Sequence, residues 1–87
     1  MTVFFVERDL KGITMDQLAG AQKAAISKAG EMSKNGTKIN YIRSTFIPGE
    51  DRCMCLFDAS KAADVKRLNE EANIPFKRIV EALDLTP

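Results

Sequence analysis

Cys53 and Cys55 are the residues of this sequence whose type and spacing are best suited to metal chemistry. Alternation along a strand would put both thiols on one face. The pair alone is not a site, but it would suit a soft metal, copper(I) or zinc, if a partner chain supplied further ligands. The alternative interpretation is packing in a core, where free cysteines are common. The sequence therefore offers Cys53 and Cys55 as candidate metal ligands.

The two cysteines also indicate the cellular compartment of the protein. Residues two apart on a strand lie roughly 6.5 Å apart at Cα, with parallel side chains, which does not favour a disulfide between them. Free thiols are typical of a reducing interior. We therefore expect a cytoplasmic location.

Tyr41, Arg43 and Thr45 form a second candidate set. Their alternation predicts that a ring, a guanidinium and a hydroxyl share one face of a strand. Such a face would line a small-ligand pocket, and an exposed edge strand would show the same pattern. Both interpretations remain open from the sequence.

Glu7 is the third candidate, on the same predicted strand face as Phe5. It would act as a base or ligand if Arg43 or Arg52 came near. The alternative is a charge at a strand end that a neighbouring strand neutralises. The predicted ligand-binding set is therefore Glu7, Tyr41, Arg43, Thr45 and Arg52.

Composition excludes several classes of function. The chain has no histidine, which excludes His-dependent triads, and it has no glycine-rich phosphate loop. Thirteen basic and twelve acidic residues give a net charge of +1, so nucleic acid is not an expected partner. No apolar run approaches the ~20 residues of a membrane span, and the N-terminus lacks the features of a signal peptide.

Periodicity predicts the elements of the first half. Residues 2–8 are apolar on both faces, as in a covered strand. Thr14 and Gln17 fit a capping box, so a helix begins there and ends at Asn35-Gly36. Its predicted apolar stripe, at spacings of three and four, consists of Met15, Leu18, Ala21, Ala25, Ala29 and Met32.

Periodicity also predicts the elements of the second half of the chain. Strands are predicted over residues 38–47 and 52–57, joined by a type II turn at Pro48-Gly49. Asp58 or Ser60 would cap a second helix that ends before Pro75. Residues 76–83 suit strand or helix by propensity, and their place in the order favours a strand.

These elements predict one α+β domain over residues 1–87, with the order βαββαβ of a ferredoxin-like fold. The apolar first and third strands would lie centrally in an antiparallel sheet, with both helices on one face. The other face would lack cover in a monomer. We therefore predict a homodimer of the dimeric α/β barrel type.

A family resemblance rests on short segments in a fixed order along nearly the whole chain. They are Phe5-Val6-Glu7-Arg8, Tyr41-Ile42-Arg43-Ser44-Thr45, Asp51-Arg52, Cys55-Leu56-Phe57-Asp58-Ala59, Asn73-Ile74-Pro75 and Arg78-Ile79. Together they resemble a small bacterial family catalogued as domain of unknown function 4242. The resemblance implies a dimeric ferredoxin-like fold and a possible divalent metal cofactor, since at least one member is described as nickel-binding.

Three functional hypotheses follow. The first is a non-catalytic homodimeric protein that binds a small ligand or a metal ion. The second is a cofactor-independent, oxygenase-like or isomerase-like enzyme that uses Tyr41, Arg43 and Glu7 in a barrel cavity, by analogy of fold. The third is a structural or accessory protein.

Overall fold

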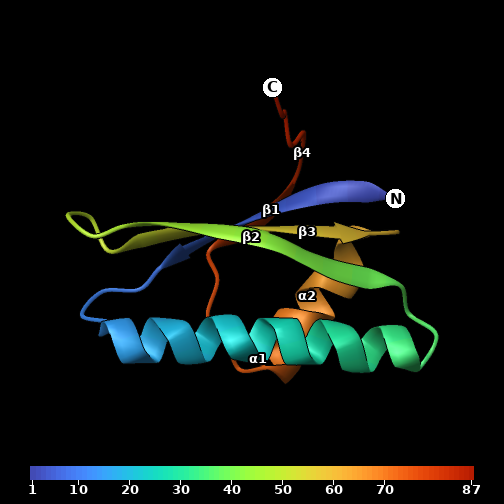
Figure 1. Ribbon diagram of the computed structural model, residues 1–87, viewed down its shortest axis with the longest axis horizontal. Helices are drawn as coiled ribbons and strands as arrows, with labels where there is room; N and C mark the ends of the chain where they lie inside the picture. The colour runs from blue at the N-terminus through green and yellow to red at the C-terminus, as the bar shows by residue number, and fades with distance from the viewer.

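The computed structural model describes all 87 residues and has six elements in the predicted order (Figure 1). They are β1 (Thr2–Asp9), α1 (Met15–Lys34), β2 (Ile39–Ile47), β3 (Arg52–Ala59), α2 (Ala62–Glu71) and β4 (Arg78–Ala82). The last element is a strand, as its position in the order favoured. The βαββαβ order and the antiparallel sheet confirm the ferredoxin-like α+β fold.

The sheet has the strand order β2-β3-β1-β4, and every neighbouring pair is antiparallel. The apolar strands β1 and β3 are therefore central, as predicted. Both helices lie on one side of the sheet, and the C-terminal segment leaves it on the other side (Figure 1). We call these two sides the helix face and the open face.

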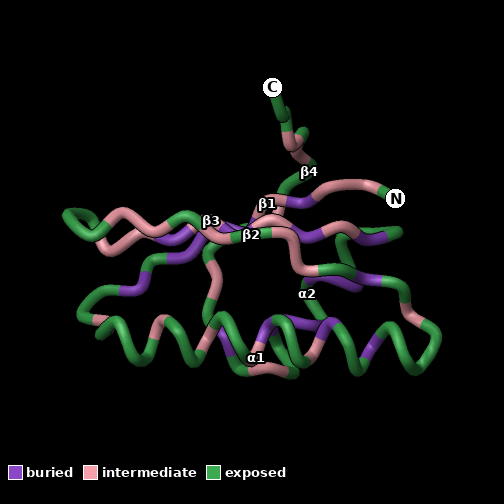
Figure 2. The backbone as a smooth tube through the Cα atoms, viewed as in Figure 1, coloured by how far each residue is buried: buried purple, intermediate pink, exposed green.

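The core lies between the helices and the sheet (Figure 2). On β1, Phe4 and Val6 point to the helix face and are buried, whereas Phe5 points to the open face and is only partly covered. The buried apolar residues are Phe4, Val6, Leu10, Ala25, Ala29, Met32, Ile39, Cys53, Cys55, Phe57, Ala59, Val65, Leu68 and Ile74. Neither helix combines the length and apolarity that a membrane span requires.

Helix α1 begins with the predicted capping box. The Gln17 amide donates to Thr14 Oγ1 at 3.1 Å, and the Thr14 amide donates to Gln17 Oε1 at 3.0 Å. Ala25, Ala29 and Met32 are buried toward the sheet. Met15 is 68 % exposed, so its predicted place in the stripe was wrong: it lies in the first turn, at the margin of the buried arc.

Two local predictions were wrong: the position of the positive φ in the turn between β2 and β3, and the N-cap residue of α2. The turn between β2 and β3 has its positive φ at Asp51 (53°) rather than at Gly49. The Asp51 carboxylate accepts from the Gly12 amide at 3.3 Å, and its carbonyl accepts from the Leu10 amide at 2.8 Å.

Neither Asp58 nor Ser60, the two predicted N-cap residues, caps α2. Its N-cap is Lys61, without a side-chain hydrogen bond, because β3 continues through Ala59 and includes Asp58.

Candidate functional site

A β-bulge in β2 decides which polar side chains meet. Tyr41 pairs with Phe57 and Arg43 with Leu56, so Ile42 is one residue extra. Tyr41 therefore faces the helices, with its ring at 5.6 Å and 78° from that of Phe57. Beyond the bulge the alternation is inverted, and Arg43 faces the open side. The predicted common face of Tyr41, Arg43 and Thr45 was wrong.

Thr45 pairs with Met54 and is on the open face with Arg43. Arg43 Nη2 donates to Asp84 Oδ2 at 3.0 Å, just after β4. This ion pair spans the open face, since β2 and β4 are its two edges. Arg43 thus contacts the C-terminal segment and not Glu7.

Glu7 lies on the open face and is only 8 % exposed, because two arginines cover it. Arg52 Nη2 donates to Glu7 Oε2 at 2.8 Å, and Arg78 Nε donates to Oε1 at 2.9 Å. These hydrogen bonds, Arg52 first, hold the pKa of Glu7 below its usual value of 4.5. Both carboxylate oxygens are occupied, which is the arrangement of a neutralised strand-end charge.

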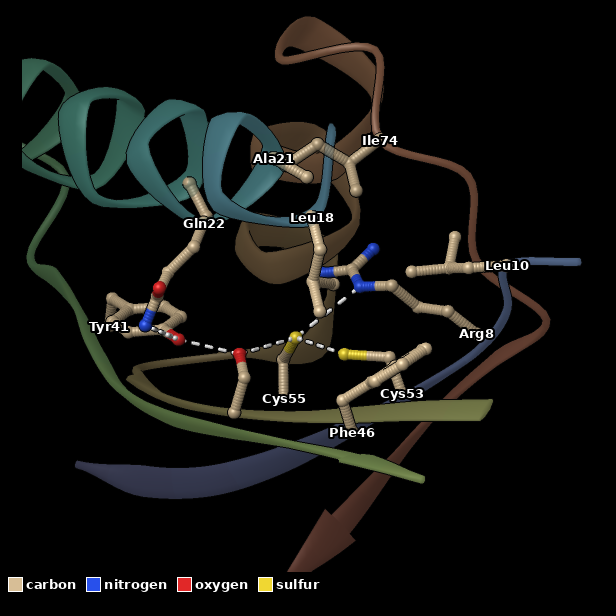
Figure 3. Close-up of a pocket in the computed structure, with 12 residues that line it drawn as sticks. Arg8, Leu10, Leu18, Ala21, Gln22, Tyr41, Phe46, Cys53, Cys55 and Ile74 are labelled. Carbon is tan, nitrogen blue, oxygen red and sulfur yellow. Dashed lines mark hydrogen bonds between the residues drawn. The ribbon is translucent and has the colours of Figure 1, made fainter. Parts of the chain in front are cut away.

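The helix face contains a cavity of about 130 Å³ between α1 and the sheet (Figure 3). Its lining is mostly apolar. The lining residues are Arg8, Leu10, Leu18, Ala21, Gln22, Ala25, Tyr41, Ser44, Phe46, Cys53, Cys55 and Ile74. Both candidate metal ligands therefore line one pocket, whereas four of the five predicted ligand-binding residues lie on the other side of the sheet.

A chain of polar contacts crosses this pocket and ends at the two thiols (Figure 3). Gln22 Nε2 donates to the Tyr41 hydroxyl at 3.0 Å, and that hydroxyl is 2.5 Å from Ser44 Oγ. Ser44 Oγ donates to Cys55 Sγ at 2.9 Å. The sulfur atoms of Cys53 and Cys55 are 3.8 Å apart, and both residues are free thiols.

Arg8 supplies a buried positive charge beside Cys55. It is 2 % exposed, its Nε donates to Cys55 Sγ at 3.3 Å, and its Nη1 donates to the Pro75 carbonyl at 3.1 Å. Its Nη2 is buried without a hydrogen-bond partner. Since a buried cation requires a compensating charge, Arg8 favours a thiolate at Cys55.

The pKa values of the two thiols are shifted in opposite directions. Hydrogen bonding from Cys53 lowers the pKa of Cys55 to about 5, with further lowering by Arg8 and Ser44 against an opposing effect of burial. The same contact, together with burial, raises the pKa of Cys53. These opposite shifts favour the thiolate form at Cys55, with the Cys53 thiol as its hydrogen-bond donor.

Sequence reasoning missed Arg8, Ser44 and Gln22 as members of this site. A signal for Arg8 was present, because it alternates with Phe4 and Val6 on the covered face of its strand. A charged residue at a core position indicates a specific partner.

The fold and this pocket define a small ferredoxin-like α+β protein with an internal thiol pair. The profile of the SCO4226-like family of nickel-responsive proteins matches residues 4–82, and the chain belongs to this family. The crystal structure of SCO4226 from Streptomyces coelicolor A3(2) superposes with a TM-score of 0.77 at 25 % identity, covering 97 % of this chain and 99 % of that chain. No curated protein sequence matches significantly.

The donors of a single chain do not fit nickel. The sequence has no histidine, and imidazole is a usual nickel donor in proteins. Nowhere do three side chains of the types His, Cys, Asp or Glu come together. The pocket has two sulfur atoms next to a guanidinium, and the positive charge of that group disfavours binding of a divalent cation.

Proposed function

We propose that this protein is a non-catalytic, homodimeric binding protein that holds a metal ion between Cys53 and Cys55. The observation behind the proposal is the pair of sulfur atoms 3.8 Å apart on the wall of a mostly apolar cavity. The thiolate is the form of cysteine that binds metals, and Cys55 has the lowered pKa of such a group. The apolar lining limits the access of water to a bound ion.

Membership of a nickel-responsive family supports a metal-related role in general. The proposal of a homodimer is based on the open face, where no layer of the same chain covers Phe5, Leu56 and Val80. A cytoplasmic location agrees with two free thiols.

A second candidate function is the binding of a small organic molecule. The buried, unpartnered Arg8 Nη2 favours it, because a ligand oxygen in the cavity would satisfy that donor. The volume of about 130 Å³ suits a molecule near the size of benzene, which occupies a cavity of about 150 Å³ in another protein. This function uses the same pocket, with Arg8 in place of the thiols as the main recognition group.

The enzyme hypothesis has less support. Its three residues were Tyr41, Arg43 and Glu7, but Tyr41 faces the helices and the other two face the open side. Glu7 is also fully paired with arginines. These residues do not form one catalytic site within a chain.

Metal loading tests the proposed function. Untagged, reduced protein is incubated anaerobically with copper(I), zinc(II) or nickel(II), desalted and measured by elemental analysis. We expect about one ion per chain for at least one metal, and loss of that ion in Cys53→Ser/Cys55→Ser. Met54→Leu is the matched control, because Met54 lies between the cysteines in sequence but faces the open side. Equal retention by wild type and the double variant would contradict the proposal.

A further inference from the structure

From the thiol pair and Arg8 we infer that the pocket selects a soft monovalent cation, copper(I), over the divalent ions nickel(II) and zinc(II). This inference rests on the proposed function and names the ion. Three features of the pocket support it: the number of donors, the balance of buried charge and the unpaired Nη2 of Arg8.

The number of donors favours a low coordination number. Cys53 and Cys55 are the two sulfur donors, and no group of three His, Cys, Asp or Glu side chains exists in the chain. Zinc(II) in structural sites takes four protein ligands, and nickel(II) favours square-planar sets of nitrogen and oxygen. Thiolates suit copper(I) as well as zinc(II), but copper(I) forms two-coordinate complexes, so two thiolates complete its ligand set.

Arg8 sets the charge that the pocket tolerates. Two thiolates carry a charge of −2 and the guanidinium carries +1. A monovalent ion therefore gives a neutral assembly, whereas a divalent ion leaves an excess positive charge beside a residue that is 2 % exposed. An uncompensated buried charge is strongly unfavourable. Charge balance thus discriminates against nickel(II) and zinc(II).

The free Nη2 of Arg8 is independent support for an anionic occupant. It is a buried donor without an acceptor, in a pocket where one sulfur already accepts from Nε of the same side chain (Figure 3). A bis-thiolate complex of a monovalent cation carries a charge of −1 and matches this guanidinium. The Ser44 hydroxyl adds a further hydrogen bond to Cys55.

The sulfur spacing is compatible with a bridging ion. Two metal–sulfur bonds of roughly 2.3 Å each span at most about 4.6 Å. The observed 3.8 Å is shorter than this limit, so an ion that bridged the two sulfur atoms at their present positions would have a bent arrangement of its two bonds. Binding forms two copper–sulfur bonds, releases the Cys53 proton to solvent and changes no oxidation state.

Competition against bicinchoninate, a coloured copper(I) chelator, tests the inference under anaerobic conditions. We expect wild type to withdraw one copper(I) per chain. Cys53→Ser, which leaves Cys55 and its partners in place, should weaken copper(I) binding at least about 100-fold, because a direct ligand contributes more than the 10–100-fold of a residue behind the ligands. Met54→Leu should bind as wild type does.

Arg8 variants test the charge argument itself. Arg8→Lys retains the charge and should keep the preference for copper(I) over zinc(II), measured by competition with a zinc chelator. Arg8→Gln should lower that preference about 10-fold or more. If Arg8→Gln does not fold, the Arg8→Lys and Cys53→Ser results remain decisive.

The outcomes separate the two proposals. Tighter thiol-dependent binding of zinc(II) or nickel(II) than of copper(I) would overturn the choice of ion and leave the proposed function intact. Absence of thiol-dependent binding for copper(I), zinc(II) and nickel(II) alike would overturn both.

Discussion

Cys53 and Cys55 show how neighbouring residues of one type acquire different chemistry. Both are buried on the same strand face, yet Arg8 and Ser44 donate hydrogen bonds to Cys55 and not to Cys53. Cys53 donates to Cys55 and so stabilises the thiolate there. The two partners that distinguish Cys55 from Cys53 are 47 and 11 residues distant in sequence, so local spacing does not reveal them.

The first residue-scale prediction concerns thiolate formation. Ultraviolet absorbance of the reduced, metal-free protein should show one thiolate forming with a midpoint near pH 5. In Cys53→Ala the midpoint should rise, because the hydrogen bond from Cys53 is the largest cause of the lowered pKa. Two thiols that both titrate near their ordinary pKa of about 8.5 would contradict this account.

The second residue-scale prediction concerns stability. Arg8→Gln should lower the free energy of unfolding by about 3–5 kcal/mol, because it removes one member of a buried charge pair and leaves the Pro75 carbonyl without its donor. Urea denaturation measures the change. The matched control is Arg43→Gln, which breaks a largely exposed ion pair and should cost about 0–1 kcal/mol. Similar losses for the two variants would show that Arg8 is not paired as described.

Strands and helices were largely predictable because hydrophobic periodicity records which face is covered. The order βαββαβ, the central positions of β1 and β3 and the capping box at Thr14 all followed from local pattern. The bulge at Ile42 did not, because one extra residue leaves the alternation on either side intact and only inverts its sense. That inversion separated Tyr41 from Arg43 and Thr45, which uninterrupted alternation would have placed on one face.

The element-scale prediction concerns the ion pairs that link β1 to β3 and β4 at Glu7. Its folded-state pKa is below 4.5, so its contribution to stability is fully present above that value and is lost as the pH falls through the folded pKa. Wild type should therefore exceed Glu7→Gln in thermal stability at pH 7, and the difference should vanish toward pH 2–3. Glu50→Gln is the control, because Glu50 contacts only Arg52 and is mostly exposed. A difference that persists unchanged at low pH would contradict this assignment.

The whole molecule has one covered and one open sheet face, and this asymmetry is the basis for the proposed homodimer. The helix face encloses the thiol pocket, while the open face combines apolar side chains with the paired charges around Glu7. Leu83 and Leu85 in the C-terminal segment are more than 80 % exposed on that side (Figure 1). A second copy is the simplest cover for such a surface.

The prediction at this scale is that Leu56→Arg converts a dimer into a monomer. Leu56 lies on β3 at the centre of the open face, where a charge would be buried without a partner in a face-to-face dimer. Sedimentation velocity at micromolar concentration measures the change. Lys23→Glu, on the exposed side of α1, should remain dimeric. A wild-type protein that sediments as a monomer would contradict the dimer.

Native mass spectrometry of untagged protein, as isolated from cells and beside Cys53→Ser/Cys55→Ser, is the most direct test of the central claim that the thiol pair holds a metal ion. We predict a wild-type mass that exceeds the sequence mass by about one metal ion per chain, and no excess in the double variant. An equal excess in both proteins, or an excess matching an organic molecule that the variant also retains, would contradict the claim.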